Sequence, residues 1–127
     1  MIAIGIGANS KAGDEDFASA LASIRAETGG DVVATFEDAP FHALLQSAAS
    51  RQSLAHRTLP LADLRKRNDD CLTRSEPSLA LYGVASIAEA SALAAAGPCS
   101  ELIAARRIIG SVTVAAAKSA DTKESPQ

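Results

Sequence analysis

The chain opens with Met1-Ile-Ala-Ile-Gly-Ile-Gly-Ala-Asn-Ser-Lys-Ala-Gly13. The run from Ile2 to Ile6 is short, apolar and rich in β-branched residues, which is typical of a strand buried in the middle of a sheet. A glycine-containing loop follows, and Asp14 to Asp16 then offer an N-cap and an acidic first turn for a helix. A strand, a loop and a helix in this order place backbone N–H groups and Lys11 where an anion can bind.

Helices and strands alternate along the rest of the chain. Apolar residues recur at helical spacing from Phe17 to Ile24, and Gly29-Gly30 ends that helix. A similar stripe predicts a second helix that Asp38 caps. A capping box, Ser86-Ile-Ala-Glu89, opens a nearly all-apolar helix that ends at Gly97. Further elements are predicted as strands at 31–36, 54–59, 102–109 and 112–117 and as a short helix between Ser75 and Gly83.

This order of elements predicts an α/β fold, namely a three-layer α/β/α sandwich with a mixed, mostly parallel sheet and a C-terminal β-hairpin. We expect the first strand in the interior of the sheet, and the hairpin from Leu102 to Ala117 within the same sheet. The 127 residues suffice for one domain, which is expected to cover residues 1–118. The polar, aperiodic tail at 119–127 is expected to be disordered.

Composition excludes several classes of function. Apolar residues make up 47% of the chain and charged residues 21%, and the net charge is −3. This acidic balance argues against a nucleic-acid interface, and no apolar run approaches the roughly 20 residues that span a bilayer. The start lacks the features of a signal peptide, so we expect a soluble, cytoplasmic protein. Cys71 and Cys99 lie far apart without metal-ligand spacing, and we expect both to be reduced.

Several polar residues have a structural explanation that needs no ligand. Gly5 and Gly7 can form a tight turn as readily as an anion cradle. Glu89 completes the capping box. His42 and His56 are isolated in the sequence, so they predict neither a metal site nor a catalytic base.

Two further pairs leave alternatives open. Ser75 and Glu76 begin the short helix, and Ser75 would act as a nucleophile only beside a base. Arg106 and Arg107 are adjacent in a strand, so their side chains point to opposite faces and only one can face a pocket. Arginine suits planar carboxylates, although an edge-strand arginine also guards a sheet against pairing with another edge.

A family resemblance emerges from Tyr82-Gly-Val-Ala-Ser-Ile-Ala-Glu-Ala-Ser-Ala-Leu-Ala-Ala-Ala-Gly97 and from Val112-Thr-Val-Ala-Ala-Ala117. Gly5-Ile-Gly7 ends the first strand, and Ser75-Glu76 precedes the segment Gly83 to Ala90. With these motifs the sequence resembles the cobalamin-biosynthesis family that comprises CobE and the C-terminal domain of CbiG. The resemblance covers about residues 1–118.

Some positions depart from that family's pattern. Its first loop usually reads Gly-x-Gly-Cys-Arg-Arg-Gly, of which Lys11 is the one cation left in this chain. The family's lysine in the penultimate strand is replaced by Arg106, with Arg107 beside it. The segment that opens the second helix is reduced to Glu37-Asp38-Ala-Pro. These losses leave the fold expectation in place and weaken the transfer of a catalytic mechanism.

The resemblance implies a role in corrin-ring metabolism. A free-standing, CobE-like domain would bind or hand on a corrinoid or precorrin intermediate in the aerobic pathway. One alternative is a hydrolase that opens a (cobalt-)precorrin lactone as CbiG does, so any enzymatic activity would resemble that of a cobalt-precorrin-5A hydrolase. A second alternative is a non-enzymatic module that interacts with other cobalamin-pathway enzymes. We expect no cofactor, metal, nucleic-acid partner or membrane partner.

The catalytic residues, if any, stay unassigned, but the family motifs and the loop chemistry together suggest a ligand-binding set. Its rim would need donors for the acetate and propionate side chains of a corrinoid, and Tyr82 is the one candidate for ring stacking. The set comprises Gly5, Gly7, Asn9, Ser10, Lys11, Ser75, Glu76, Glu89 and Arg106.

Overall fold

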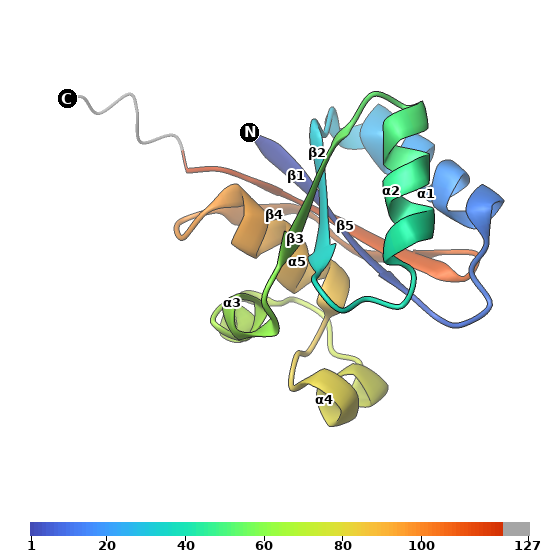
Figure 1. Ribbon diagram of the computed structural model, residues 1–127. Helices are drawn as coiled ribbons and strands as arrows, with labels where there is room; N and C mark the ends of the chain where they lie inside the picture. The colour runs from blue at the N-terminus through green and yellow to red at the C-terminus, as the bar shows by residue number, and fades with distance from the viewer. Residues whose placement is uncertain (121–127) are drawn as a thin grey trace.

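The computed structural model describes residues 1–120, which form a five-stranded sheet with helices on both faces (Figure 1). The order of strands across the sheet is β3-β2-β1-β5-β4, so the first strand is central, as the apolar opening segment predicts. The strands are β1 (Ile2–Ala8), β2 (Val32–Phe36), β3 (Ala55–Leu59), β4 (Glu101–Ile109) and β5 (Val112–Lys118).

The sheet is mixed. Strands β1, β2 and β3 run parallel to one another, whereas β5 pairs antiparallel with both β1 and β4. The hairpin of β4 and β5 turns at Gly110, whose positive φ of 64° is costly for a residue with a side chain. The predicted C-terminal hairpin is therefore confirmed, and it lies in the same sheet as the first strand.

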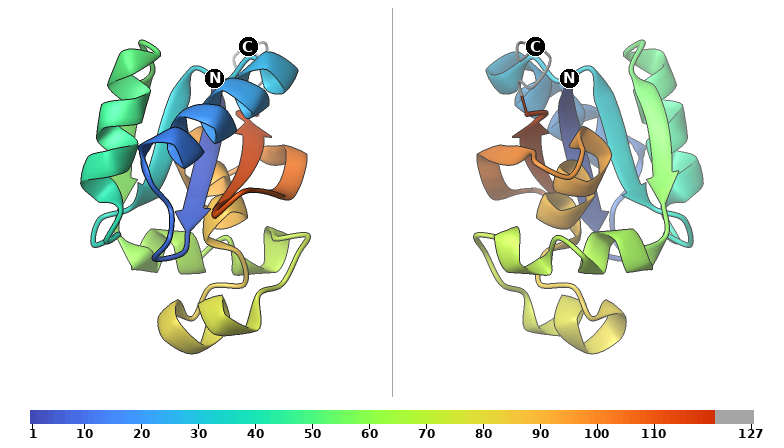
Figure 2. Two further views of the ribbon diagram at one scale, coloured as in Figure 1. Left: turned by 90° about the vertical axis from the view of Figure 1, so that its right-hand side faces the viewer. Right: turned by 90° about the vertical axis from the view of Figure 1, so that its left-hand side faces the viewer.

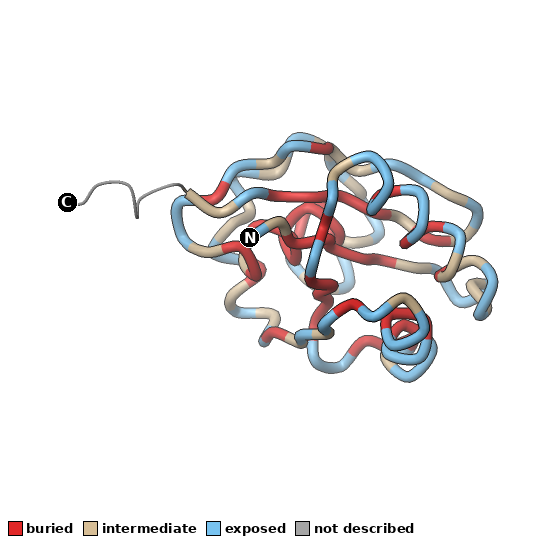
Figure 3. The backbone as a smooth tube through the Cα atoms, turned by 90° about the horizontal axis from the view of Figure 1, so that it is seen from above, coloured by how far each residue is buried: buried red, intermediate tan, exposed pale blue. Residues whose placement is uncertain are grey.

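Two helices cover one face of the sheet and one helix covers the other (Figure 2). The first face carries α1 (Asp14–Thr28) and α2 (His42–Arg51), and the second carries α5 (Ile87–Ala96). This arrangement confirms the three-layer α/β/α sandwich. Buried residues concentrate in the middle of the molecule (Figure 3). Nine of the ten residues of α5 are buried, as are most residues of β1, β2 and β5.

Three smaller helical segments connect β3 to α5. They are α3 (Leu61–Arg65), a single 3₁₀ turn at Asn68–Asp70, and α4 (Glu76–Tyr82). The third of these lies at one end of the molecule, beyond the end of the sheet, and none of its residues is buried (Figures 1 and 2). The polar region, for which the sequence predicts little regular structure, thus forms a long connection outside the three layers.

The helix ends agree in part with their predictions. Ser75 caps α4, and Gly83 ends it with a left-handed φ of 71°. At α1, however, the N-cap is Gly13, whose N–H donates to Asp16 over 2.9 Å. At α2, Asp38 is not the cap, because it lies in a turn that is closed by the hydrogen bond from the N–H of Ala39 to the carbonyl of Phe36, and the helix begins only at His42.

The two histidines lie side by side although they are far apart in sequence. The rings of His42 on α2 and His56 on β3 meet edge to face, with centroids 4.9 Å apart. Burial, together with the neighbouring His42, lowers the pKa of His56. Nε2 of His56 is buried without a hydrogen-bond partner among residues 1–120. This environment favours a neutral, packed ring.

Residues 121–127 lie outside the described part of the chain, and with them most of the tail that the sequence predicts to be disordered. Within the described part, the backbone N–H of Ser119 donates to Met1 and its hydroxyl donates to Ala96. Among the described residues no single helix is long and apolar enough to cross a membrane. Only α4 and α5 taken together, across a bend of 64°, pass that test by length and composition.

The two glycines of β1 leave room for different neighbours, and the first of them allows α5 to approach the sheet closely. A Cβ at Gly5 would lie 1.8 Å from the carbonyl oxygen of Ala88 and 2.6 Å from the nitrogen of Ala92, both in the backbone of α5. A Cβ at Gly7 would lie 2.7 Å from the hydroxyl of Thr113. Because the Gly5 contacts are with backbone, no rotation of a side chain relieves them. The Gly-x-Gly motif is thus a helix–sheet packing device at its first glycine.

We expect Gly5→Ala to lower the free energy of unfolding by at least about 2 kcal/mol, since the added methyl group overpacks the helix–sheet interface. Chemical denaturation followed by circular dichroism measures the change. Gly13→Ala is the matched control, because no atom lies within 4 Å of a Cβ there, and it should cost less, since it only replaces a glycine N-cap by alanine. Equal effects of the two substitutions would show that α5 does not depend on the close approach at Gly5.

Candidate functional site

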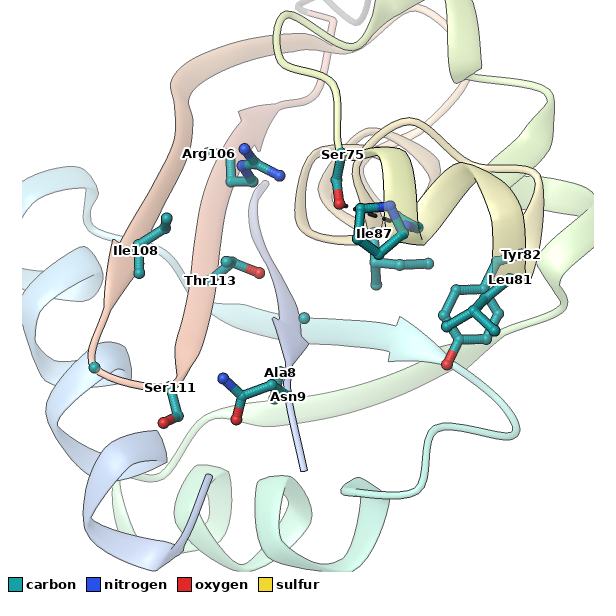
Figure 4. A pocket seen from close by; sticks show the side chains of 14 residues that line it. Ala8, Asn9, Ser75, Leu81, Tyr82, Ile87, Arg106, Ile108, Ser111 and Thr113 are labelled. Carbon is teal, nitrogen blue, oxygen red and sulfur yellow. Dashed lines mark hydrogen bonds between the residues drawn. The ribbon is translucent and has the colours of Figure 1, made fainter. Parts of the chain in front are cut away.

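A cavity of about 380 Å³ lies at the carboxyl end of β1, between α4 on one side and the β4–β5 hairpin on the other (Figure 4). Ligands of open α/β sheets commonly bind at this end of the strands, where neighbouring connections diverge. Fourteen residues line the cavity: Gly7, Ala8, Asn9, Ser75, Pro77, Ser78, Leu81, Tyr82, Ile87, Arg106, Ile108, Gly110, Ser111 and Thr113.

One end of the cavity is cationic. Arg106 is the only charged residue among those that line it. Its guanidinium makes no hydrogen bond or ion pair with any residue of the described part, 1–120, and it faces Ser75 across the cavity (Figure 4). A guanidinium without a partner in the protein can donate hydrogen bonds to a ligand, and it cannot accept any.

The neighbouring Arg107 points to the opposite face of the sheet. There its guanidinium pairs with both carboxylate oxygens of Glu27 on α1, one of them at 2.9 Å. The hydrogen bonds and charge of this pair lower the pKa of Glu27 and raise that of Arg107. One arginine therefore serves helix–sheet contact, and the other remains available in the cavity.

The other end of the cavity is polar and uncharged. Asn9 follows β1, and its backbone N–H donates to the carbonyl of Ser111 in the hairpin turn over 3.1 Å. Its side-chain oxygen accepts the N–H of Lys11 over 2.8 Å. Thr113 projects its hydroxyl beside Gly7. These contacts fix the end of β1 against the hairpin turn, so this side of the cavity is preformed.

Between the two polar ends the lining is apolar. Ile87 is largely buried at the start of α5. Leu81 on α4 and Ile108 on β4 stand on opposite walls and are 72% and 69% exposed. Large exposed apolar side chains around a concave site are typical of a surface that contacts a ligand. Tyr82 packs its ring against Phe36, with centroids 4.9 Å apart.

The carboxylate of Glu89 joins the two walls of this cavity from behind. Glu89 is fully buried on α5. One of its oxygens accepts the backbone N–H groups of Leu72 and Thr73 over 2.8 and 2.9 Å, and the other accepts that of Arg106 over 2.8 Å. The segment that leads into Ser75 and the strand that carries Arg106 are thus tied to one side chain.

A β-bulge in β4 makes the third of these bonds possible. The pairing with β5 shifts between Ala104 and Arg107, so the N–H of Arg106 turns toward Glu89. This differs from the capping box predicted for α5. Ser86 does accept the N–H of Glu89 over 3.1 Å, but the Glu89 carboxylate binds distant N–H groups instead of folding back onto its own helix.

Cys71 lies next to Leu72 and is half-buried. Burial, with the nearby Glu89 charge as a second cause, raises the pKa of its thiol to about 11. Such a thiol is protonated at neutral pH and is a poor nucleophile. Cys99 is exposed, and both cysteines are free. No group of three or more His, Cys, Asp and Glu side chains within residues 1–120 is placed to hold a metal ion.

The structure brings together four residues of the predicted ligand-binding set: Gly7, Asn9, Ser75 and Arg106. The other five do not line the cavity. Gly5 is covered by α5, and Glu89 is engaged by backbone N–H groups. Ser10 and Lys11 lie in an exposed turn beyond Asn9, and Glu76 is exposed and pairs with Arg74.

Several residues that line the cavity belong to no sequence pattern that indicates a binding site. Ser111 and Thr113 follow the predicted glycine turn, but Thr113 lies beside Gly7 because of the register of β1 and β5, which the alternation within one strand does not fix. Leu81 and Ile108 read as ordinary apolar residues of a helix and a strand. Their exposure depends on where α4 lies, which no local pattern fixes.

A second, more open depression of about 410 Å³ lies between α3 and the end of α5. Its main cation, Arg67, is already engaged. The guanidinium donates to the carbonyls of Leu93, Gly97 and Ser100 and to Asp70. It therefore caps the carboxyl end of α5. The guanidinium of Arg67 thus has a structural role, whereas that of Arg106 has no partner in residues 1–120.

Comparison with protein families identifies the family to which this chain belongs. Residues 2–117 match the family model described as cobalamin synthesis G C-terminus (CbiG_C). The chain belongs to this family. It is therefore a protein of cobalamin biosynthesis, as the motifs around Glu89 and Ser75 predict. No curated protein sequence matches it significantly.

Solved structures of related proteins share the fold. CobE, a protein from the cobalamin (vitamin B12) biosynthetic pathway, is 26% identical with a TM-score of 0.79, over 92% of this chain and 89% of that one. Cobalamin biosynthesis protein ChiG from Agrobacterium tumefaciens is 31% identical with a TM-score of 0.72, over 95% of this chain and 100% of that one.

A third structure extends the likeness of the fold to a larger protein. It is a homolog of cobalamin biosynthesis protein G from Sulfolobus solfataricus, 23% identical with a TM-score of 0.67. The match covers 91% of this chain but 36% of that one. In this larger protein, the CbiG C-terminal fold thus accounts for about a third of the chain.

Loss of the Glu89 carboxylate should destabilise the protein strongly. We expect Glu89→Ala to lower the free energy of unfolding by about 3–5 kcal/mol, because three part-buried backbone N–H groups lose the fully buried carboxylate that accepts them. Glu89→Gln should cost about 1–3 kcal/mol, since its oxygen can serve one wall while its NH₂ group faces the N–H donors of the other. Urea denaturation measures both changes.

The exposed Glu76→Gln is the matched control, with an expected change within about 0.5 kcal/mol. A loss below about 1 kcal/mol for Glu89→Ala would contradict the structural role given to its three hydrogen bonds.

Proposed function

We propose that this protein binds a corrinoid or precorrin intermediate of cobalamin biosynthesis in the cavity between α4 and the β4–β5 hairpin. The observation that carries the proposal is the combination of one unpaired guanidinium, a preformed polar end and an exposed apolar rim. A corrinoid is flat and apolar across its ring and carries acetate and propionate side chains at its edge. Each part of the cavity therefore has a counterpart on such a ligand.

The size of the cavity favours partial enclosure of the ligand. About 380 Å³ is at the lower end of the volumes of small-molecule sites, and a corrinoid exceeds a drug-sized molecule. The cavity can take one edge of the ring with a side chain, while the ring extends over Leu81 and Ile108. This geometry suits a protein that holds an intermediate and releases it to an enzyme.

The lining supports binding over lactone hydrolysis. Hydrolysis would need a base beside a nucleophile or beside a water molecule. Ser75 is the one conspicuous hydroxyl at the cationic end, and none of the fourteen lining residues is His, Asp, Glu, Lys or Cys. His42 and His56 pack against each other on α2 and β3, away from the lining residues. These contacts therefore favour a binding role over hydrolysis.

The proposal is tested by titrating the protein with a metal-free corrinoid and following the visible absorption of the ring. We expect a saturable spectral change for the wild type. Leu81→Glu should weaken binding at least about tenfold, because it removes an apolar contact and brings a carboxylate to the mouth of the cavity.

Leu44→Glu is the matched control, since Leu44 on α2 is 36% exposed but does not line the cavity. Its affinity should equal that of the wild type. Absence of any saturable change in the wild type would refute the proposal. Unchanged affinity in Leu81→Glu would show that the corrinoid binds elsewhere, and equal loss in both variants would show that the loss is not specific to the cavity.

A further inference from the structure

The two polar side chains that face each other at the cationic end of the cavity, Arg106 and Ser75, favour donation of hydrogen bonds to a ligand. A guanidinium has five N–H donors and no acceptor. Opposite it, Ser75 Oγ already accepts the backbone N–H of Ser78 over 3.4 Å, which leaves its hydroxyl hydrogen directed to another partner. No carboxylate lines the cavity, although acidic residues outnumber basic ones in the chain.

From this arrangement we infer that the cavity distinguishes the charge state of a corrinoid side chain, and that it takes a free carboxylate and rejects the corresponding carboxamide. The inference rests on the proposed function and adds the chemical class of the intermediate. A carboxylate accepts hydrogen bonds at both oxygens and pairs with the planar guanidinium in a bidentate way. A carboxamide of the same shape offers one oxygen, and its NH₂ group faces donors.

Rejection of an amide by this site follows from the cost of unmatched polar groups. When an amide enters, donors of Arg106 or of the ligand remain without acceptors in a partly desolvated site, whereas a carboxylate satisfies them. At the neutral polar end, the side-chain oxygen of Asn9 already accepts the backbone N–H of Lys11, so this amide acceptor is not free for the NH₂ group of a carboxamide.

Glu89 supports the discrimination by fixing the backbone position from which the side chain of Arg106 extends. Its carboxylate holds the backbone N–H of Arg106 over 2.8 Å at the bulge of β4, and it also holds the segment that leads to Ser75. Arg106 and Ser75 therefore face each other at a separation that the fold sets.

The test compares two corrinoids that differ in their side chains, a dicyano-corrinoid with free acid side chains (cobyrinic acid) and one with amide side chains (cobinamide). Affinities are measured by absorption titration and calorimetry at fixed pH and salt. We expect the wild type to bind the free acid at least about tenfold more tightly, the ratio that separates a charged from a neutral hydrogen-bonded pair.

Arg106→Gln keeps donors at the site but removes the charge and the fork. It should weaken binding of the free acid about tenfold while leaving binding of the amide within about twofold, so that the preference disappears. Arg107→Gln is the matched control, because Arg107 pairs with Glu27 on the opposite face, and it should keep the preference. Circular dichroism checks that each variant is folded.

The outcomes separate this inference from the proposed function. Equal affinities of the wild type for both corrinoids, or a preference that survives in Arg106→Gln, would overturn the discrimination while leaving corrinoid binding intact. Failure of the wild type to bind either corrinoid would overturn the proposed function and the inference with it.

Discussion

The cavity depends on one buried carboxylate. Glu89 has no exposed surface, and its two oxygens accept three backbone N–H groups from two segments that are far apart in sequence. A buried carboxylate is costly to desolvate, so it persists only where such bonds repay the cost. Here these hydrogen bonds come from the loop before α4 and from the bulge of β4, which form the two walls of the cavity. Stability and the geometry of the site are therefore supplied by the same interaction.

A second constraint sets how that carboxylate reaches both walls. Gly5 lets the backbone of α5 approach β1 closely, and almost the whole of α5 is buried as a result. Because α5 is close to the sheet, Glu89 lies within hydrogen-bond distance of β4. The loop before α4 then folds over the start of α5, and α4 itself projects beyond the sheet with no buried residue. A rigid sandwich thus presents one wall, and a lightly packed helix presents the other.

Most of the fold follows from local patterns, whereas the site follows from them only in part. The apolar run of β1, the left-handed glycines after α1 and α4, and the turn at Gly110 are local features, and the structure has them where the sequence predicts them. Glu89 reads locally as the end of a capping box, but its partners are 16 or 17 residues away and are decided by tertiary packing. Lys11 and Arg106 read as equivalent cations, and the hairpin geometry brings only Arg106 to the cavity.

The most direct test of where the corrinoid binds is a ¹H–¹⁵N correlation spectrum of the labelled protein recorded during titration with a free-acid corrinoid. We expect the largest shift changes at the amides that line the cavity on both walls, namely Gly7, Asn9, Ser75, Arg106 and Thr113. Changes centred on the second depression, at Lys66, Arg67, Ala94 and Gly97, would contradict the assignment of the cavity between α4 and the hairpin as the binding site.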